Sequence, residues 1–448
     1  MYDIEIGKSW QCCPAIDFSS FPQQSFLSMN PSQPHRKLWN RNFLLLWQGQ
    51  FISSIGKQLF AMAAMLWLKT ITDSGTLMGM VMTVAMLPMV VIGPIAGVIV
   101  DRWDRKRLIA WTDIAGGIAV AAAGAVFFLL PDRLAILVGV VFTVTVATGL
   151  LDTLSQPSIS ASLPLLSPAE KLEAANSINM AGLQIAVFIS QGLAGLLFVL
   201  TGMPVLIMIN AATYLCAGIS ELFIHLPHRS AEADPSIHPW LRFKKYLMEG
   251  FRFVYHNRGM RTGLLLNMAL NFFVAPVLVL LPFYVEDYIG LPQQWYGYFM
   301  AVFGLGGLLG FILAGAFPTR GLAREIAVSG SLMVQTGLIV VMLFFKFPGF
   351  QMPAFAVIGL LNGILNVNFN TLIQQITPGN LLGRVQSLST TAVTAVLPLG
   401  MAVSGIIFDA IGKNVPVMFA VSGGMSFLFS IICIFSKEYR RFLRYTVS

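Results

Sequence analysis

Apolar runs of 20 or more residues recur along the chain and are separated by short polar breaks. Each run is long enough to cross a hydrocarbon core of about 30 Å at a helical rise of about 1.5 Å per residue. The pattern therefore predicts an all-α membrane protein of about twelve transmembrane helices. The predicted spans are 43–68, 76–100, 108–130, 134–156, 176–200, 203–226, 262–285, 295–317, 326–346, 351–373, 385–408 and 414–436.

The longest polar break, residues 227–261, divides these spans into two sets of six. It contains a helix-like stretch from Trp240 to Asn257 with an apolar face and a mainly basic face, which is typical of a helix in the membrane interface. The plainer interpretation is a linker helix that only ties two bundles together. The predicted organisation is a disordered cytoplasmic tail at 1–36, an N-terminal six-helix bundle at 37–226, a cytoplasmic linker with an interfacial helix at 227–261, a C-terminal six-helix bundle at 262–436 and a cytoplasmic tail at 437–448.

The two halves repeat each other at a shift of 210 residues. This shift places SPAEKLEAANSI (167–178) on TPGNLLGRVQSL (377–388), and GLLD (149–152) on GLLN (359–362). Paired halves in a multi-span chain are typical of a transporter whose site lies between them. We therefore expect two pseudo-symmetric bundles that rock around a central site.

The charged residues indicate how the chain is oriented. If both termini are cytoplasmic, the outer loops hold only Lys69, Arg133, Lys346 and Lys413 out of 28 Lys and Arg residues. This is the positive-inside pattern, and it predicts a multi-pass protein of the cell (plasma or inner) membrane with both termini in the cytoplasm. The net charge of +8 then reflects topology and the lipid bilayer, and it does not indicate a nucleic-acid partner.

The composition of 56% hydrophobic and 11% charged residues argues against a water-soluble protein of this length, which needs far more charge to cover its surface. The five His residues lie in the tail, at a span end or in the central break, and no nucleophile elbow, phosphate loop or His/Glu metal set is present. The four Cys residues form no disulfide or metal pattern. The sequence thus predicts no enzyme, no cofactor, no metal site and no nucleotide domain for an ATP-driven pump.

One loop carries a recognisable motif. Between the second and third predicted spans, residues 97–107 read GVIVDRWDRKR. A Gly, an Asp-Arg pair and a following basic cluster resemble the signature loop of the major facilitator superfamily. The resemblance implies the major facilitator fold and a latch at the inner gate, although a plain positive-inside loop would contain the same basic residues. The implied gate residues are Gly97, Asp101, Arg102, Arg105 and Lys106.

A worn copy of the motif follows the eighth predicted span, with Thr319 in the position of Asp101, so we expect a weak or absent second latch. Position 104 is Asp where the family usually has Gly, which places the geometry of the first turn in question. Four other stretches resemble the branch that contains macrolide-efflux proteins and a bacterial siderophore exporter. They are RNFLLLWQGQFISSIG (41–56), EGFRFVYHNRGMR (249–261), LPFYVEDYIG (281–290) and GRVQSL (383–388).

The resemblance implies a monomeric secondary transporter that exports small amphipathic molecules by alternating access, in exchange for protons from a proton gradient. A dedicated exporter of one metabolite or siderophore is the alternative within transport. A membrane scaffold or receptor that transports nothing is the alternative from another class.

The resemblance also implies a cavity lined by the first, fourth, seventh and tenth spans. Each of these spans carries a polar stripe on one helical face, and such stripes should face water or protein rather than lipid. The alternative is that the same groups form hydrogen bonds between helices and stabilise the bundle. The candidate cavity residues are Gln50, Ser54, Lys57, Asn267, Asn271, Asn362 and Asn366, and the repeat aligns Asp152 with Asn362.

Lys57 is the most unusual of these residues, because an ammonium deep in a span needs a partner or a polar cavity. It is expected to bind substrate, form a gate contact, titrate, or complete a structural ion pair. Asp152 is the candidate proton carrier because it lies on the polar stripe of the fourth span. Asp152, Asp113 and Glu221 all lie near cytoplasmic span ends, and the structural alternative for each is to pair with the loop arginines.

Overall fold

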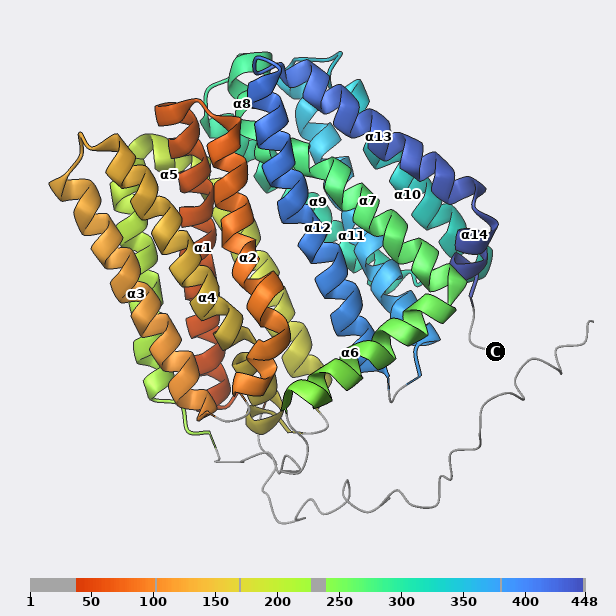
Figure 1. The fold of residues 1–448 in the computed structure, drawn as a ribbon, viewed down its shortest axis with the longest axis horizontal. Helices are drawn as coiled ribbons and strands as arrows, with labels where there is room; N and C mark the ends of the chain where they lie inside the picture. Colours follow the sequence, from red (N-terminus) through yellow and green to blue (C-terminus); the bar gives the residue numbers. More distant parts are fainter. Residues whose placement is uncertain (1–37, 101–102, 169–170, 227–238, 379–380, 446–448) are drawn as a thin grey trace, which may run out of the picture. The chain divides into compact units, whose positions relative to one another are not determined.

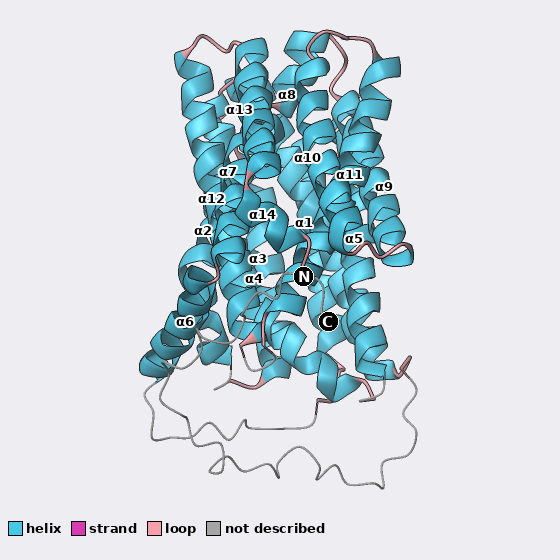
Figure 2. Cartoon of the chain, turned by 90° about the vertical axis from the view of Figure 1, so that its right-hand side faces the viewer, coloured by secondary structure: helices cyan, strands magenta, loops and turns pink. Residues whose placement is uncertain are grey.

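The computed structural model describes residues 38–100, 103–168, 171–226, 239–378 and 381–445, without the side chains of 94–95, 97–100, 173 and 239–247. The predicted tail at 1–36 and the linker residues 227–238 lie outside the described residues. Figure 2 shows that helices running side by side form nearly all of the described chain, and no strand occurs in it.

Eleven helices of the described chain are long and apolar enough to cross a membrane. Four shorter elements lie between or after them. The long helices are α1 (Arg41–Thr72), α2 (Gly75–Val100), α3 (Arg105–Leu129), α4 (Leu134–Leu166), α5 (Leu172–Leu222), α7 (Arg258–Val279), α9 (Gln294–Ala316), α10 (Gly321–Val341), α11 (Pro348–Ile376), α12 (Leu382–Ala410) and α13 (Val415–Phe435), and the short ones are α6 (Pro239–His256), α8 (Leu281–Phe283), η3 (Tyr284–Ile289) and α14 (Lys437–Leu443).

Helix α5 accounts for the difference between eleven helices and twelve predicted spans. It is 51 residues long and contains a non-helical residue, Gly202, with φ 74° and ψ 174°. Glycine tolerates positive φ without a steric penalty, and Pro204 follows two residues later. The chain on each side of Gly202 is long enough to cross a membrane, and the break falls between the predicted spans 176–200 and 203–226. The predicted all-α fold of twelve crossings is confirmed.

The long helices form two bundles. Helices α1–α5 pack mainly on one another, and α7–α13 do the same, as the two halves of Figure 1 show. The bundles meet where α2 packs on α12 and α5 packs on α9. Glycine makes this approach possible: a Cβ atom added to Gly79 would lie 2.4 Å from the Met401 carbonyl oxygen, and one added to Gly405 would lie 2.2 Å from the Gly75 carbonyl oxygen. Small residues at such crossings let two membrane helices pack backbone to backbone.

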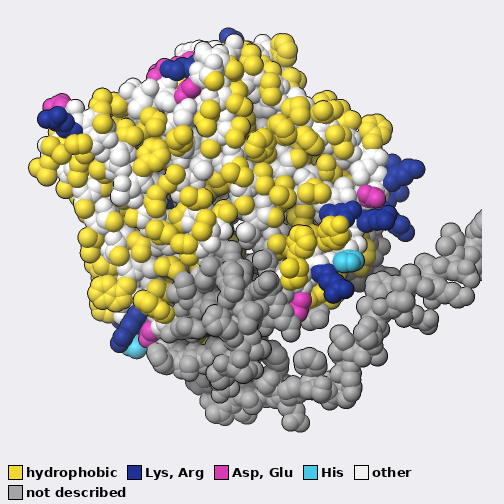
Figure 3. Space-filling model, in the orientation of Figure 1, with side chains coloured by type: hydrophobic (Ala, Val, Ile, Leu, Met, Phe, Trp, Pro, Cys, Tyr) yellow, Lys and Arg dark blue, Asp and Glu magenta, His cyan; other side chains and the backbone are white. Residues whose placement is uncertain are grey.

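The surface of the molecule is that of a protein immersed in lipid. Figure 3 shows hydrophobic side chains over most of the visible face and charged side chains gathered near its margins. Large apolar residues that would be buried in a water-soluble protein are exposed, among them Leu129, Phe317 and Phe435. Together with the eleven candidate spans, this surface identifies a multi-pass membrane protein.

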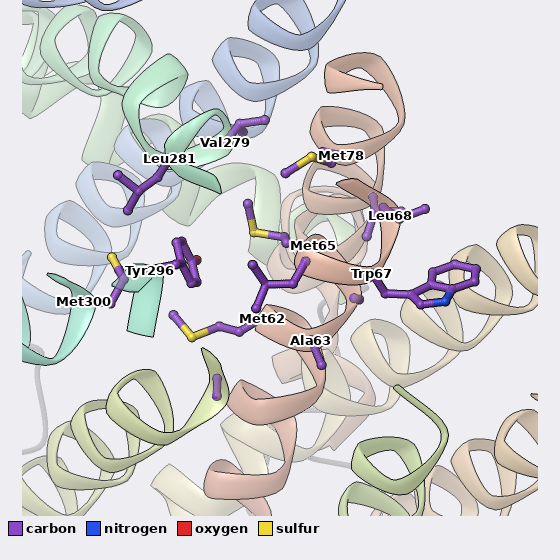
Figure 4. Close-up of a cluster of buried hydrophobic side chains, with 14 of the residues drawn as sticks. Met62, Ala63, Met65, Trp67, Leu68, Met78, Val279, Leu281, Tyr296 and Met300 are labelled. Carbon is purple, nitrogen blue, oxygen red and sulfur yellow. The ribbon is translucent and has the colours of Figure 1, made fainter. Parts of the chain in front are cut away.

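One end of the molecule is closed by apolar side chains from both bundles. Figure 4 shows Met62 and Met65 of α1, Met78 of α2, and Tyr296 and Met300 of α9 in one buried cluster. We call the end near this cluster, where α1 ends and α2 begins, the sealed end. The opposite end, where the loop after α2 leads into α3, is called the motif end.

Candidate functional site

A cluster of ionisable side chains lies inside the N-terminal bundle. The Lys57 Nζ lies 2.6 Å from the Asp152 Oδ1 and 4.0 Å from the Asp113 Oδ1. These residues come from α1, α4 and α3, and Glu221 of α5 is buried in the same bundle. The four residues are called the charge cluster. Lys57 thus has the carboxylate partners that an ammonium needs in a low-dielectric interior.

Tyr214 of α5 holds the ion pair from one side. The Lys57 Nζ lies 4.6 Å from the centre of its ring, and the Tyr214 hydroxyl donates a 3.5 Å hydrogen bond to the Asp152 Oδ2. Tyr214 is 1% exposed, so its ring has little freedom. Gly116 of α3 makes room for it, since a Cβ atom there would lie 3.0 Å from the ring. The aromatic face adds a cation–π attraction to the ion pair.

Two carboxyl groups of the cluster are deeply buried and incompletely bonded. Glu221 is 0% exposed, and its Oε1 accepts a 2.8 Å hydrogen bond from the Gln50 Nε2. Asp113 is 1% exposed. Among the described residues, the Glu221 Oε2 and the Asp113 Oδ2 have no hydrogen-bond partner. A buried carboxylate in that condition has lost its hydration without full replacement.

The expectation that loop arginines pair with Asp113 and Glu221 is wrong for the described contacts. Asp113 lies about 12 Å along α3 from its start, at about 1.5 Å per residue, and faces Lys57 instead. Glu221 lies at the end of α5 but faces α1, where Gly49 leaves room for its carboxyl group and Gln50 binds it. The rotation of each helix, rather than its distance from a loop, decides the partner.

The polar stripe of α4 has two uses. Asp152 is directed to Lys57 with its side chain 34% exposed, whereas the Thr148 hydroxyl donates to the Val144 carbonyl within the same helix. Ser54 lies on α1 one turn before Lys57 and is half-buried. The structure therefore brings Gln50, Lys57 and Asp152 into the charge cluster or its contacts, and leaves Ser54 beside it on the same helix.

The predicted asparagines of the C-terminal bundle form pairs within their own helices. The Asn271 Nδ2 donates to the Asn267 Oδ1 at 2.7 Å on α7, and the Asn366 Nδ2 donates to the Asn362 Oδ1 at 3.1 Å on α11. Asn362 and Asn366 are exposed, while Asn267 and Asn271 are half-buried. In the described hydrogen bonds, none of them contacts the charge cluster.

The motif end is described in part. Gly97 belongs to the last turn of α2, whereas Asp101 and Arg102 lie outside the described residues. Asp104 caps α3 by accepting a 3.1 Å hydrogen bond from the Arg107 backbone N–H, which is a favourable use of Asp at this position. The Arg105 Nη1 donates a 3.2 Å hydrogen bond to the Ala161 carbonyl oxygen of α4. Lys106 lies in the first turn of α3. Because Asp101 is outside the described residues, the latch stays a prediction.

Sequence reasoning missed ion pairs between α14 and α10 in the C-terminal bundle. The predicted tail after residue 436 begins with helix α14, and the Arg440 Nε donates a 2.6 Å hydrogen bond to the Glu325 Oε1 of α10. Arg444 also pairs with Glu325, which raises the pKa of its guanidinium. Thr319, in the worn motif, donates to the Asn368 Oδ1 at 2.9 Å. The spacing of Arg440 and Arg444 by one helical turn was the available sign in the sequence that both share one helical face.

Sequence reasoning also missed polar contacts that join the bundles at the sealed end. The Lys69 Nζ lies 2.8 Å from Glu286 and 2.8 Å from Asp287 of η3. The Asp409 carboxylate of α12 accepts hydrogen bonds from the backbone N–H groups of Gly75 at 3.0 Å and Thr76 at 2.9 Å. A carboxylate at the N-terminus of α2 accepts hydrogen bonds from free backbone N–H groups and interacts favourably with the positive end of the helix dipole.

The family model described as Major Facilitator Superfamily matches residues 46–397. Macrolide efflux protein A of Streptococcus pyogenes is 26% identical over 411 residues, covering 90% of this chain and 98% of that protein. The multidrug efflux pump Tap of Mycolicibacterium fortuitum is 24% identical over 343 residues, covering 73% of this chain and 80% of that protein.

Two solved transporters share the fold. The nucleoside transporter NupG matches with a TM-score of 0.68 and 14% identity, covering 90% of this chain and 99% of that one. The D-xylose-proton symporter matches with a TM-score of 0.67 and 13% identity, covering 88% of this chain and 97% of that one. With the match to the family model over most of its length, the chain belongs to the Major Facilitator Superfamily and is a membrane transporter rather than an enzyme.

Proposed function

We propose that the protein is a secondary exporter of small amphipathic molecules that works by alternating access and exchanges its solute for protons. The efflux names of its relatives support the direction and the substrate class. The observation that carries the proton exchange is the ion pair of Lys57 with Asp152, at 2.6 Å inside the N-terminal bundle.

The charge balance of the cluster supports proton exchange. The cluster holds one ammonium and three carboxyl groups, and two of these, Asp113 and Glu221, are almost fully buried. An uncompensated buried carboxylate costs several kcal/mol, so the binding of a proton to one of these groups would remove an unfavourable buried charge. The cluster therefore offers proton-binding groups inside the bundle.

Asp152 is the group through which protons enter and leave. Its side chain is 34% exposed, whereas Asp113 is 1% exposed. Protonation of Asp152 neutralises its attraction for Lys57, and the ammonium is left with Asp113 at 4.0 Å. This exchange of partners moves the end of a long side chain on α1, and α1 contacts both α4 and α5. A proton is thereby coupled to the packing of the bundle.

The solute would bind between the bundles. The N-terminal side offers Ser54 and Lys57, while the buried Gln50 is bonded to Glu221. The C-terminal side offers carboxamides of α7 and α11. The Lys69 contacts at the sealed end form the outer gate, and the motif end, with Asp101, Arg102, Arg105 and Lys106, forms the inner gate. In this arrangement the protein acts as a monomer in the cell membrane with both termini in the cytoplasm, as the distribution of basic residues predicts.

Flux measurements in proteoliposomes test the proposal. Purified protein is reconstituted, a pH gradient is imposed, and uptake of the macrolide erythromycin and the dye ethidium is followed for the wild type, Asp152→Asn and the control Asp132→Asn. Asp132 is an exposed carboxylate between α3 and α4. We expect the gradient to accelerate uptake in the wild type and in Asp132→Asn, but not in Asp152→Asn.

Two outcomes would contradict the proposal in different ways. Solute movement that ignores the pH gradient in the wild type would remove the proton coupling and leave a uniporter. An absence of movement for a wide panel of solutes under any gradient would favour a scaffold or receptor, while movement of one metabolite alone would replace broad export by a dedicated exporter.

A further inference from the structure

Three asparagines follow one face of α11 at intervals of four residues. Asn362, Asn366 and Asn370 are all exposed, and Gln374 continues the same spacing. Residues four apart on a helix lie one above the other, so the three carboxamides form a continuous stripe. We call Asn362, Asn366 and Asn370 the carboxamide stripe.

The stripe keeps hydrogen-bonding capacity that its own contacts do not use. The Asn366 Nδ2 donates to the Asn362 Oδ1 and carbonyl, and the Asn370 Nδ2 donates to the Asn366 carbonyl. Within the described chain, the Asn362 Nδ2 and the Asn366 Oδ1 have no hydrogen-bond partner, although both side chains are exposed. A carboxamide offers two donors and an acceptor with two lone pairs, so a donor and an acceptor stand one turn apart.

One contact links the stripe to a helix that packs on the other bundle. The Gln386 Nε2 of α12 donates a 2.9 Å hydrogen bond to the Asn370 Oδ1. Helix α12 is also the helix of this bundle that packs on α2 of the N-terminal bundle. Exposed carboxamides are unfavourable against lipid tails, where nothing satisfies them. The stripe therefore borders the region between the bundles.

The stripe lies on an uncharged helix. Helix α11 contains no Asp, Glu, Lys or Arg, and neither does α9, which packs on it, whereas Arg384 of α12 is paired with Glu249. A charged ligand group would find no counter-ion on α11 or α9, so its burial beside the stripe is unfavourable. A neutral group that both donates and accepts hydrogen bonds, as a hydroxyl does, matches the free donor and acceptor.

We propose that the carboxamide stripe binds the hydroxyl and carbonyl groups of a neutral, polyoxygenated amphipathic ligand. This rests on the proposed export of small amphipathic molecules and specifies their chemistry. The C-terminal bundle recognises the solute through neutral hydrogen bonds, and the charge cluster of the N-terminal bundle serves proton exchange. A lipophilic cation without hydroxyl groups does not use the stripe.

Direct binding tests this division. The full chain is placed in nanodiscs, and binding of two labelled probes is measured against empty nanodiscs: octyl glucoside below its critical micelle concentration, and tetraphenylphosphonium. Asn366→Leu is nearly isosteric and removes the central carboxamide. We expect it to weaken octyl glucoside binding by about tenfold, the loss of one to two net hydrogen bonds, and to leave tetraphenylphosphonium binding unchanged.

Asn368→Leu is the matched control on the same helix. Asn368 is 7% exposed and bonded to Thr319, so its loss affects packing rather than the stripe. We expect it to lower the melting temperature without changing the ratio of the two affinities. An equal loss of both probes in Asn366→Leu, an unchanged affinity for octyl glucoside, or no binding of octyl glucoside by the wild type would overturn the inference.

Binding in nanodiscs needs no gradient, so the two proposals fail separately. Intact, stripe-dependent octyl glucoside binding combined with flux that ignores the pH gradient would remove the proton coupling and keep the stripe. Flux driven by the pH gradient, combined with octyl glucoside binding that Asn366→Leu does not change, would keep the proton coupling and remove the role of the stripe.

Discussion

The two bundles of this transporter have related sequences but hold their polar groups in different ways. The N-terminal bundle buries an ion pair, Lys57 with Asp152. The shift of 210 residues that aligns the halves places Asn267 at the position of Lys57 and Asn362 at that of Asp152. In the C-terminal bundle those asparagines bond within their own helices instead of across the bundle.

This difference shows how one repeat can serve two tasks. A carboxylate loses its charge when a proton binds and an ammonium loses its charge when a proton leaves, so a pair of them responds to pH. Carboxamides do not titrate, but they donate and accept hydrogen bonds at any pH. A bundle with an ammonium–carboxylate pair suits coupling to protons. A bundle with paired carboxamides suits the recognition of a neutral solute. The sealed end joins them through Lys69 and Asp409.

The largest effect is expected from Lys57→Met. Methionine keeps the length of the side chain but leaves Asp113 and Asp152 without their cation. We expect a loss of about 2–3 kcal/mol of stability, less than for a fully buried pair because Asp152 is 34% exposed. Transport should fall by an order of magnitude or more, measured as initial flux in proteoliposomes beside thermal unfolding in detergent.

The double variant Lys57→Met with Asp152→Asn provides the control. Removing both charges takes away the uncompensated carboxylate, so the melting temperature should recover in part while proton coupling stays lost. If Lys57→Met alone transports every solute at the wild-type rate, the charge cluster has no part in transport.

A smaller effect is expected from Glu325→Gln in the C-terminal bundle. This change removes the carboxylate that holds Arg440 and Arg444 of α14. Both arginines are exposed, with side chains 45% and 47% accessible, so we expect a clearly smaller loss of stability than for Lys57→Met. Thermal unfolding in low and high salt measures it. A loss as large as that of Lys57→Met would mean that charges stabilise the two bundles to the same degree.

The smallest effect is expected from Tyr214→Phe. The ring over Lys57 remains, and only a 3.5 Å hydrogen bond to Asp152 is lost. We expect transport within about threefold of the wild type and a stability change of about 1 kcal/mol or less. Tyr214→Leu, which also removes the aromatic face, should be clearly worse. Equal behaviour of the two variants would show that the cation–π contact contributes nothing.

The sequence predicted the helices and their division better than it predicted their contacts. Apolar length determines where a span begins and ends, and the interruption at Gly202 falls between two predicted spans. The sequence also marked Lys57 and Asp152 as unusual, because each is costly in lipid. That they pair could not be predicted, since the contact joins residues 95 positions apart and depends on the rotation of α1 and α4.

The contacts that sequence reasoning missed involve charges at helix ends. Lys69, Glu286 and Asp409 lie where a span meets a loop, and a charge in that position usually indicates only exposure to water. In the structure these residues join the bundles at the sealed end. Their partners lie more than two hundred residues away along the chain, so neither spacing nor composition indicates them.

The most direct test of the account counts protons at Asp152. Proteoliposomes loaded with a pH-sensitive dye are given solute without an imposed gradient, and proton movement is recorded beside solute movement. We expect solute entry to drive protons in the opposite direction in the wild type, and Asp152→Asn to move solute without protons. Proton movement of the same stoichiometry in Asp152→Asn would contradict the assignment of coupling to the charge cluster.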